Sequence, residues 1–145
     1  MSEMVPADQG RIRVVVIPDP VVATNFQFTQ DIRTRWRVVC LKFQYVADAN
    51  ASNRIVSVGF TVAGTLAFST PARVLIVAGE TWNISFFEGG SSITPAGGRV
   101  QTGCLPPKYL INGQTVIGSA VDGIQAGDQI SVISLTVEEW IEPLV

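Results

Sequence analysis

Apolar and polar residues alternate with a period of two along much of this chain. The clearest case is residues 35–46, where apolar side chains occupy every second position: Val39, Leu41, Phe43 and Tyr45. Residues 54–62 repeat this spacing with Val56, Val58, Phe60 and Val62. Because successive side chains of an extended strand point to opposite faces, the pattern predicts strands that each bury one face.

Further short segments have the β-branched and aromatic composition of strands. They are residues 66–68, 73–77, 81–87, 100–105, 109–111, 114–117 and 130–140. Residues 11–17 (RIRVVVI) form a first strand, which we expect at a sheet edge because Pro18-Asp19-Pro20 lacks two amide donors. No apolar stripe of helical spacing persists for three turns. The pattern predicts an all-β fold: one antiparallel β-sandwich domain over residues 1–145, jelly-roll-like, with about eight short strands.

The connections between these segments carry their own signals. Residues 18–34 form a long connection without periodicity, and residues 89–98 (GGSSITPAGG) form a loop with an exposed tip. Asn112-Gly113 is the pair favoured in a two-residue β-hairpin turn, so residues 109–111 and 114–117 are predicted to pair. Residues 1–10 are interpreted as a flexible N-terminal arm.

Composition places the chain among folded proteins. Of its 145 residues 47% are hydrophobic and 15% charged, a balance far from that of disordered chains. No apolar run approaches the ~20 residues that span a bilayer, and the N-terminus has no signal-peptide pattern. We therefore expect synthesis in the cytoplasm and no membrane partner. The high apolar content also favours burial against neighbouring subunits.

Charge is distributed unevenly along the chain. Residues 1–54 carry seven Arg and Lys against five Asp and Glu, whereas residues 100–145 carry one against five. Eight of the ten basic residues are Arg, which binds carboxylates through a planar fork and is common at interfaces. A basic end that meets an acidic end is one way to form contacts between copies.

The residue inventory argues against catalysis. The chain has no histidine, the commonest general base and zinc ligand. Glu138 and Glu139 are adjacent on a strand and point to opposite faces, and Asp122 and Asp128 are interpreted as turn carboxylates. Residues 48–53 are interpreted as a turn with solvated side chains in preference to a calcium loop. We predict a non-enzymatic protein without cofactor or metal, whose two cysteines are buried free thiols.

Seven residues are candidates for a protein interface. They are Arg33, Arg35, Trp36, Arg37, Arg73, Trp82 and Trp140. The three alternating arginines beside Trp36 should share one strand face, which would also suit nucleic acid, but the acidic remainder of the chain favours a protein contact. Stacking of sugars on the tryptophans is a further alternative.

A succession of short motifs resembles small accessory virion proteins of tailed bacteriophages. The motifs lie in Trp36 to Val58 (WRVVCLKFQYVADANASNRIVSV), Leu105-Pro106-Pro107, Ile124 to Gln129 (IQAGDQ) and Val137 to Trp140 (VEEW). The match extends over about residues 11–141 and consists of strand edges and turns.

The resemblance implies a structural role on the virion. The first expectation is a capsid decoration or cement protein that binds the major capsid protein on the outer surface of the capsid as a homo-oligomer, with a trimer favoured and without nucleic acid. Residues 18–34 and 89–99 would then suit clasping of neighbouring subunits. The alternatives are a tail or neck component, or a host-surface glycan-binding module of a tail fibre that uses Trp36, Trp82 or Trp140.

Overall fold

The computed structural model describes residues 10–72, 75–90 and 99–141, which form ten strands and no helix. The strands are β1 (Arg11–Ile17), β2 (Gln27–Thr29), β3 (Thr34–Val46), β4 (Ile55–Val62), β5 (Thr65–Pro71), β6 (Thr81–Glu88), β7 (Val100–Leu105), β8 (Leu110–Asn112), β9 (Val116–Asp122) and β10 (Gln129–Ile141). No described helix is long and apolar enough to cross a membrane.

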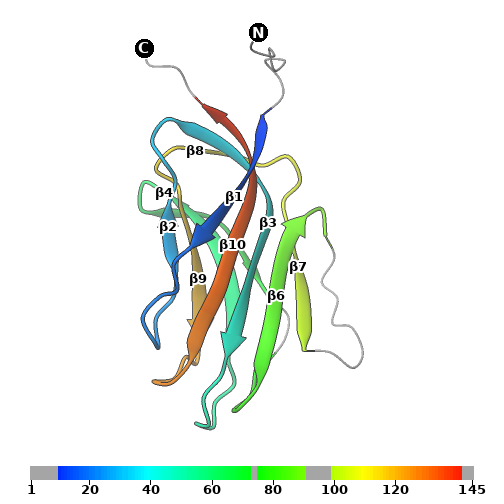
Figure 1. The fold of residues 1–145 in the computed structure, drawn as a ribbon. Coiled ribbons are helices and arrows are strands. Elements are labelled where there is room, and N and C mark those ends of the chain that lie inside the picture. The colour runs from blue at the N-terminus through cyan, green and yellow to red at the C-terminus, as the bar shows by residue number, and fades with distance from the viewer. Residues whose placement is uncertain (1–9, 73–74, 91–98, 142–145) are drawn as a thin grey trace.

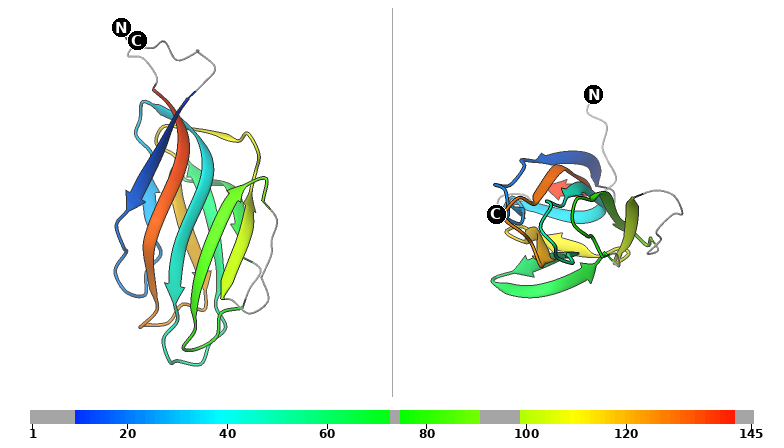
Figure 2. Two further views of the ribbon diagram at one scale, coloured as in Figure 1. Left: turned by 45° about the vertical axis from the view of Figure 1, so that its right-hand side comes forward. Right: turned by 90° about the horizontal axis from the view of Figure 1, so that it is seen from below.

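The strands form two sheets that pack as layers (Figures 1 and 2). The six-stranded sheet has the order β1-β10-β3-β6-β7, and β8 pairs with the first residues of β3. The four-stranded sheet has the order β2-β9-β4-β5. All pairs are antiparallel except β6 with β7, which is parallel. This arrangement confirms the predicted β-sandwich, with ten strands instead of about eight.

Side chains from the facing surfaces of the two sheets form the core. Along β10, Ile133, Leu135 and Val137 are buried while the residues between them are not, as the alternation predicts. Aromatic rings bridge the layers: the ring centroids of Phe26 and Phe43 are 5.4 Å apart in an edge-on contact. The apolar faces predicted from the sequence are therefore the faces that the sheets turn toward each other.

A β-bulge changes the buried set in the first half of β3. The pairing of β3 with β10 shifts register between Thr136 and Val137, which leaves Val39 as an extra residue between Val38 and Cys40. Val38 is buried and Val39 is half-buried, so the prediction that Val39 shares a face with Leu41 is wrong. The bulge places Trp36 and Val38 on the core side together with Leu41.

The predicted hairpin at Asn112-Gly113 is also wrong. β8 pairs with β3 in the six-stranded sheet, whereas β9 pairs with β2 and β4 in the other sheet. The turn therefore crosses between the layers. Its backbone forms a hydrogen bond to the connection over residues 18–34: the Gln114 N–H donates to the carbonyl oxygen of Gln30 at 2.9 Å. These contacts outweigh the local hairpin preference.

The connection over residues 18–34 is part of the sandwich and does not extend as an arm. Its Phe26 is 1% exposed, and the segment contains β2, which pairs with β9. Gln30 is also buried, and its amide donates to the carbonyl oxygens of Thr34 and Ile111 at 3.1 Å each. The predicted arm over residues 1–10 lies outside the described residues except for Gly10, as does most of the 89–99 loop.

Candidate protein-interaction surface

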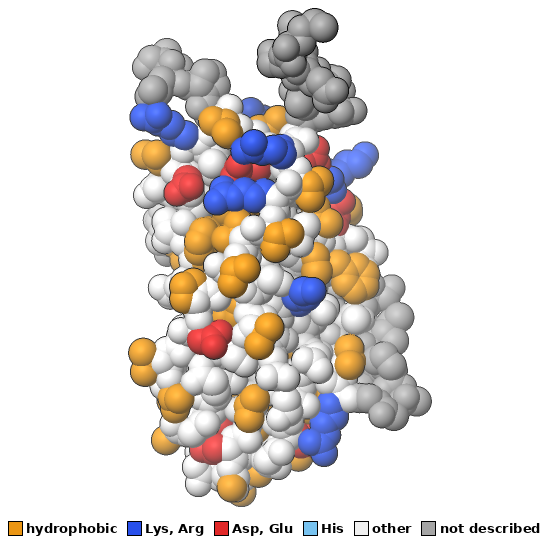
Figure 3. Space-filling model, in the orientation of Figure 1, with side chains coloured by type: hydrophobic (Ala, Val, Ile, Leu, Met, Phe, Trp, Pro, Cys, Tyr) orange, Lys and Arg blue, Asp and Glu red, His pale blue; other side chains and the backbone are white. Residues whose placement is uncertain are grey.

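Arginine side chains line a cleft at the end of the sandwich where β1 begins and β10 ends. The cleft has a volume of about 440 Å³ and is lined by Arg11, Arg13, Asp31, Ile32, Arg33, Thr34, Glu139 and Ile141. It thus holds three guanidinium groups and two carboxylates. Figure 3 shows basic and acidic side chains gathered toward this end of the molecule.

Glu139 lies beneath the cleft and is enclosed by donors. Its Oε2 accepts hydrogen bonds from the indole N–H of Trp36 at 2.8 Å and from Arg13 at 2.9 Å, and Arg11 lies 3.8 Å from Oε1. The Glu139 side chain is 3% exposed, whereas those of Arg11 and Arg13 are 71% and 45% exposed. The charge of Glu139 is thus buried while Arg11 and Arg13 face solvent, and the exposed Asp31 is the other carboxylate of the cleft lining.

Arg33 completes the positive side of the cleft. It is exposed and precedes β3, and it forms no ion pair with any residue in the described part of the chain. An exposed guanidinium without an internal carboxylate partner is available to bind one from another molecule.

Arg37, another of the predicted interface arginines, is held by carboxylates of the same chain. It lies on the outer face of the six-stranded sheet between two carboxylates, with Nη1 2.5 Å from Glu88 and Nη2 2.6 Å from Glu138. Hydrogen bonds to Glu88 and Glu138 raise its pKa. The Gly10 N–H and Arg37 in turn lower the pKa of Glu138. Arg37 is therefore already paired within the chain and ties β3 to β6 and β10.

The other two predicted arginines are placed separately. Arg35 is half-buried on the same strand as Arg37, between Trp140 of β10 and Asn112 of β8 in the sheet register. Arg73 lies outside the described residues.

Two of the three candidate tryptophans belong to the core. Trp36 is 1% exposed, and its ring stacks on Phe28 with centroids 5.8 Å apart. Trp82 is 8% exposed, and its indole N–H donates to Glu80 at 2.8 Å. Neither ring presents a face to a partner or a sugar. Trp140 is half-buried and stays a candidate.

An apolar stripe runs along β1 on the outer face of the six-stranded sheet. It consists of Ile12, Val14 and Val16, which are 62%, 62% and 77% exposed, while Val15 and Ile17 point into the core. Figure 3 shows hydrophobic side chains along this face, below the charged end. The outward side chains of this predicted edge strand are not among the seven interface candidates.

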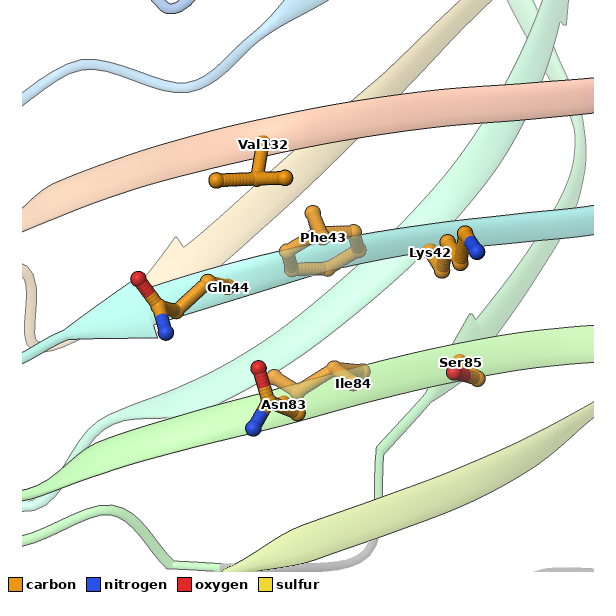
Figure 4. Close-up of a pocket in the computed structure, with 7 residues that line it drawn as sticks. All are labelled: Lys42, Phe43, Gln44, Asn83, Ile84, Ser85 and Val132. Atoms are coloured by element: carbon orange, nitrogen blue, oxygen red, sulfur yellow. The ribbon is translucent and has the colours of Figure 1, made fainter.

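A shallow hollow of about 240 Å³ lies farther along the same face (Figure 4). Its polar lining comes from Lys42 and Gln44 of β3 and from Asn83 and Ser85 of β6. At its side, Val132 occupies a bulge of β10 with a φ of 53°, a left-handed conformation that is unusual for a β-branched residue. The hollow can form hydrogen bonds but gathers little charge.

A buried ionic cluster joins three segments at the opposite end of the sandwich. Asp128 and Arg54 are 1% and 0% exposed, and Arg54 Nε donates to Asp128 Oδ2 at 2.9 Å. Asp128 also accepts from the Tyr45 hydroxyl at 2.5 Å, and Arg54 donates to Asp48 at 2.7 Å. Asp128, interpreted from the sequence as a turn carboxylate, is therefore also a buried ion-pair partner. Asp48, interpreted as a solvated turn side chain, binds Arg54.

Asp128 and Tyr45 in this cluster have shifted pKa values. Burial raises the pKa of the Asp128 carboxyl, but hydrogen bonds from Arg54, Tyr45 and two backbone N–H groups outweigh it and lower the pKa to about 2. Burial and the hydrogen bond to Asp128 raise the pKa of Tyr45. Near neutral pH the cluster therefore contains an ionised Asp128 and a neutral Tyr45.

The depressed pKa of Asp128 predicts acid sensitivity. A carboxyl that binds its proton less readily in the folded state stabilises the fold above its unfolded pKa, which is 3.8 for Asp, and loses that contribution as pH falls toward about 2. We expect the unfolding free energy of the wild type to fall across pH 4 to 2. In Asp128→Asn this component should be missing, so the difference between the two proteins in urea titrations should shrink over that range. A constant difference would contradict the assignment.

Sequence reasoning missed both Glu139 and Asp128 as organising residues. The motif succession nevertheless included Gly127-Asp128-Gln129 and Val137 to Trp140, which contain these two residues. It also included Asn53-Arg54, which contains the partner of Asp128. The structure brings Arg54 and Asp128 together across 74 positions. An Arg next to a turn and an Asp next to a glycine are each common in sequences. Only the contact between Arg54 and Asp128 in the fold therefore identifies them as an ion pair.

Comparisons with known proteins give only weak structural similarity. No protein-family model matches the sequence, and no curated protein matches it. Among solved structures, latent PorU of Porphyromonas gingivalis matches with 12% identity and a TM-score of 0.48, over 92% of this chain and 13% of that one. A T13 particle of the virus IBDV matches with 12% identity and a TM-score of 0.32, over 93% and 41%. The Gt strain of infectious bursal disease virus matches with 9% identity and a TM-score of 0.35, over 99% and 47%.

This chain thus spans less than half the length of each of these chains. At such identities and scores, the similarity does not extend to function.

Proposed function

We propose that this protein is a non-enzymatic structural component of a tailed-phage virion that binds the outside of the capsid and stabilises it. The observation that carries the proposal is the cleft at the β1 end, where guanidinium groups face solvent and Glu139 is buried beneath them. Such a surface fits a carboxylate-bearing protein partner. The resemblance of the motifs to accessory virion proteins supports the major capsid protein as that partner.

The cleft suits carboxylates in particular. Arg binds a carboxylate through two parallel hydrogen bonds, and electrostatic complementarity contributes more to specificity and association rate than to affinity. Arg11 and Arg33 are exposed at the mouth, and Ile32 and Ile141, 72% and 66% exposed, supply apolar area beside them. Charged groups at the rim and apolar groups between them are typical of a protein–protein contact.

Co-sedimentation with empty capsid shells that lack the protein tests this function. We expect saturable binding at a fixed ratio to the major capsid protein. Arg33→Glu should weaken it about tenfold, or about 1.4 kcal/mol, because it places a carboxylate against the acidic partner. Arg99→Glu is the matched control: Arg99 is also exposed, but it adjoins the start of β7 at the other end of the sheet.

The outcomes separate the alternatives. Absence of binding to shells, or equal loss in both arginine variants, would contradict the proposal. Binding to purified tails or necks instead would favour the tail or neck component. A glycan-binding module would require sugar binding that Trp140→Ala abolishes, since Trp36 and Trp82 are buried. Binding of nucleic acid with a steep salt dependence would assign the cleft to phosphates.

A further inference from the structure

We propose that β1 pairs with β1 of a second copy of this chain, so that two six-stranded sheets join into one continuous sheet across a two-fold axis at Val14. The proposal does not depend on the capsid role, since it concerns the protein alone. It rests on three observations: no other described strand pairs with the outer edge of β1, its outer side chains are apolar, and its sequence is complementary to itself in the antiparallel direction.

The outer edge of β1 has no partner strand in the described part of the chain. Within the described residues β1 pairs with β10 alone, through all seven of its residues from Arg11 to Ile17. The backbone groups of alternate residues on its other side are therefore available to a further strand. Proteins usually block such an edge with proline, lysine or a bulge. β1 contains none of these, and its register with β10 is continuous. Its two charged residues are Arg11 and Arg13, and Arg13 is neutralised by its pair with Glu139.

The other edges offer less to a partner strand. β2 has three residues, and β5 ends in Pro71 and has a register shift against β4. β5 and β7 lie close to each other, where the two sheets approach. Of the described strands, β1 combines an open edge with apolar outward side chains.

The sequence of β1 favours itself as the partner. In an antiparallel pair centred on Val14, Ile12 lies opposite Val16 of the copy and Val14 opposite itself, so the two apolar stripes meet on one face. Arg11 and Arg13 lie opposite Ile17 and Val15, so no arginine directly faces an arginine. Arg13 lies diagonal to Arg13 of the copy, and each is paired with Glu139 of its own chain. A parallel, in-register pair would set the arginines against each other. An antiparallel self-pair is the isologous contact of a two-fold dimer.

The pairing between the two β1 strands is limited at both ends. Pro18 cannot donate to the ladder, so pairing ends after Ile17 and, by symmetry, before Arg11 of the copy. The contact differs from the trimer implied by the motif resemblance, and the mass in solution separates the two.

Light scattering with sedimentation velocity on the purified full chain tests the proposal. We expect the wild type to show twice the 15.6 kDa chain mass. Val14→Lys should halve the mass, because two lysines then face each other at the axis, and Val14→Glu should do the same. An equimolar mixture of the two variants should recover the doubled mass as a mixed pair. Leu66→Lys is the control, since Leu66 is 60% exposed on β5.

The equimolar mixture of Val14→Lys and Val14→Glu tests specifically whether the two-fold axis lies at position 14. Recovery of the dimer requires position 14 of one copy to lie near position 14 of the other, and it also shows that both variants fold. A wild type that stays at 15.6 kDa, a trimer mass, a dimer that persists in Val14→Lys, or equal loss in Leu66→Lys would overturn the proposal. Arg33→Glu should leave the dimer intact, so failure of capsid binding and failure of pairing are distinguishable.

Discussion

Replacing Asp128 with asparagine is expected to lower the free energy of unfolding by about 3–5 kcal/mol, the usual effect of breaking a buried ion pair from one side. The substitution keeps the size of the side chain and removes its charge. Arg54, which is 0% exposed, would then be buried beside one remaining carboxylate, Asp48. The Tyr45 hydroxyl and the backbone N–H groups of Asp48 and Gln125 would lose a charged acceptor. Urea denaturation at pH 7, followed by tryptophan fluorescence, measures the change.

Asp122→Asn provides the control for this substitution. Asp122 is exposed at the end of β9, six positions away from Asp128, and the same chemical change there should alter the unfolding free energy by less than about 0.5 kcal/mol. Equal losses in the two variants would mean that removal of negative charge, and not the buried cluster, is responsible. A loss below about 1 kcal/mol in Asp128→Asn would contradict the pairing of Arg54.

The strands that alternation predicts most clearly are those whose one face is covered by the other sheet. Ile84 and Phe86 of β6, and Leu135 and Val137 of β10, are buried as their spacing predicts. Where the alternation predicts the wrong buried residue, a contact with a strand distant in sequence determines which side chain enters the core. The bulge opposite Thr136 moves Val38 into the core in place of Val39, and no feature of residues 35–46 alone reveals it.

The interaction surface could be predicted only in outline. Arginine enrichment in the first third of the chain agrees with the cluster of arginines at this end, where Arg33 lies exposed, but the carboxylates of the acidic C-terminal segment lie at the same end. Whether an arginine is available depends on carboxylates from distant strands: Glu88 and Glu138 occupy Arg37. Burial of a tryptophan likewise depends on what packs above it, and the segment that covers Trp36 has no periodicity of its own.

Truncation of Trp36 to alanine is expected to cost about 3–5 kcal/mol of unfolding free energy, the effect of removing a large buried aromatic side chain. The ring is 1% exposed and stacks on Phe28 of β2, so it holds the 18–34 connection against the six-stranded sheet. Its loss would also remove the indole donor from Glu139 and weaken the order of the arginine cleft. Urea denaturation followed by far-ultraviolet circular dichroism measures the change without relying on the deleted fluorophore.

Trp140→Ala separates this structural role from a surface role. Trp140 is half-buried near the end of β10, and its truncation should cost at most about 1–2 kcal/mol because less of its area leaves water on folding. Trp36→Phe should fall between the two, since it keeps a ring against Phe28 but leaves Glu139 with one donor fewer. The expected order of stability is therefore wild type, Trp140→Ala, Trp36→Phe, Trp36→Ala. Equal effects of the two alanine variants would mean that Trp36 is no more deeply engaged than Trp140, and the assignment of Trp36 to the core would fail.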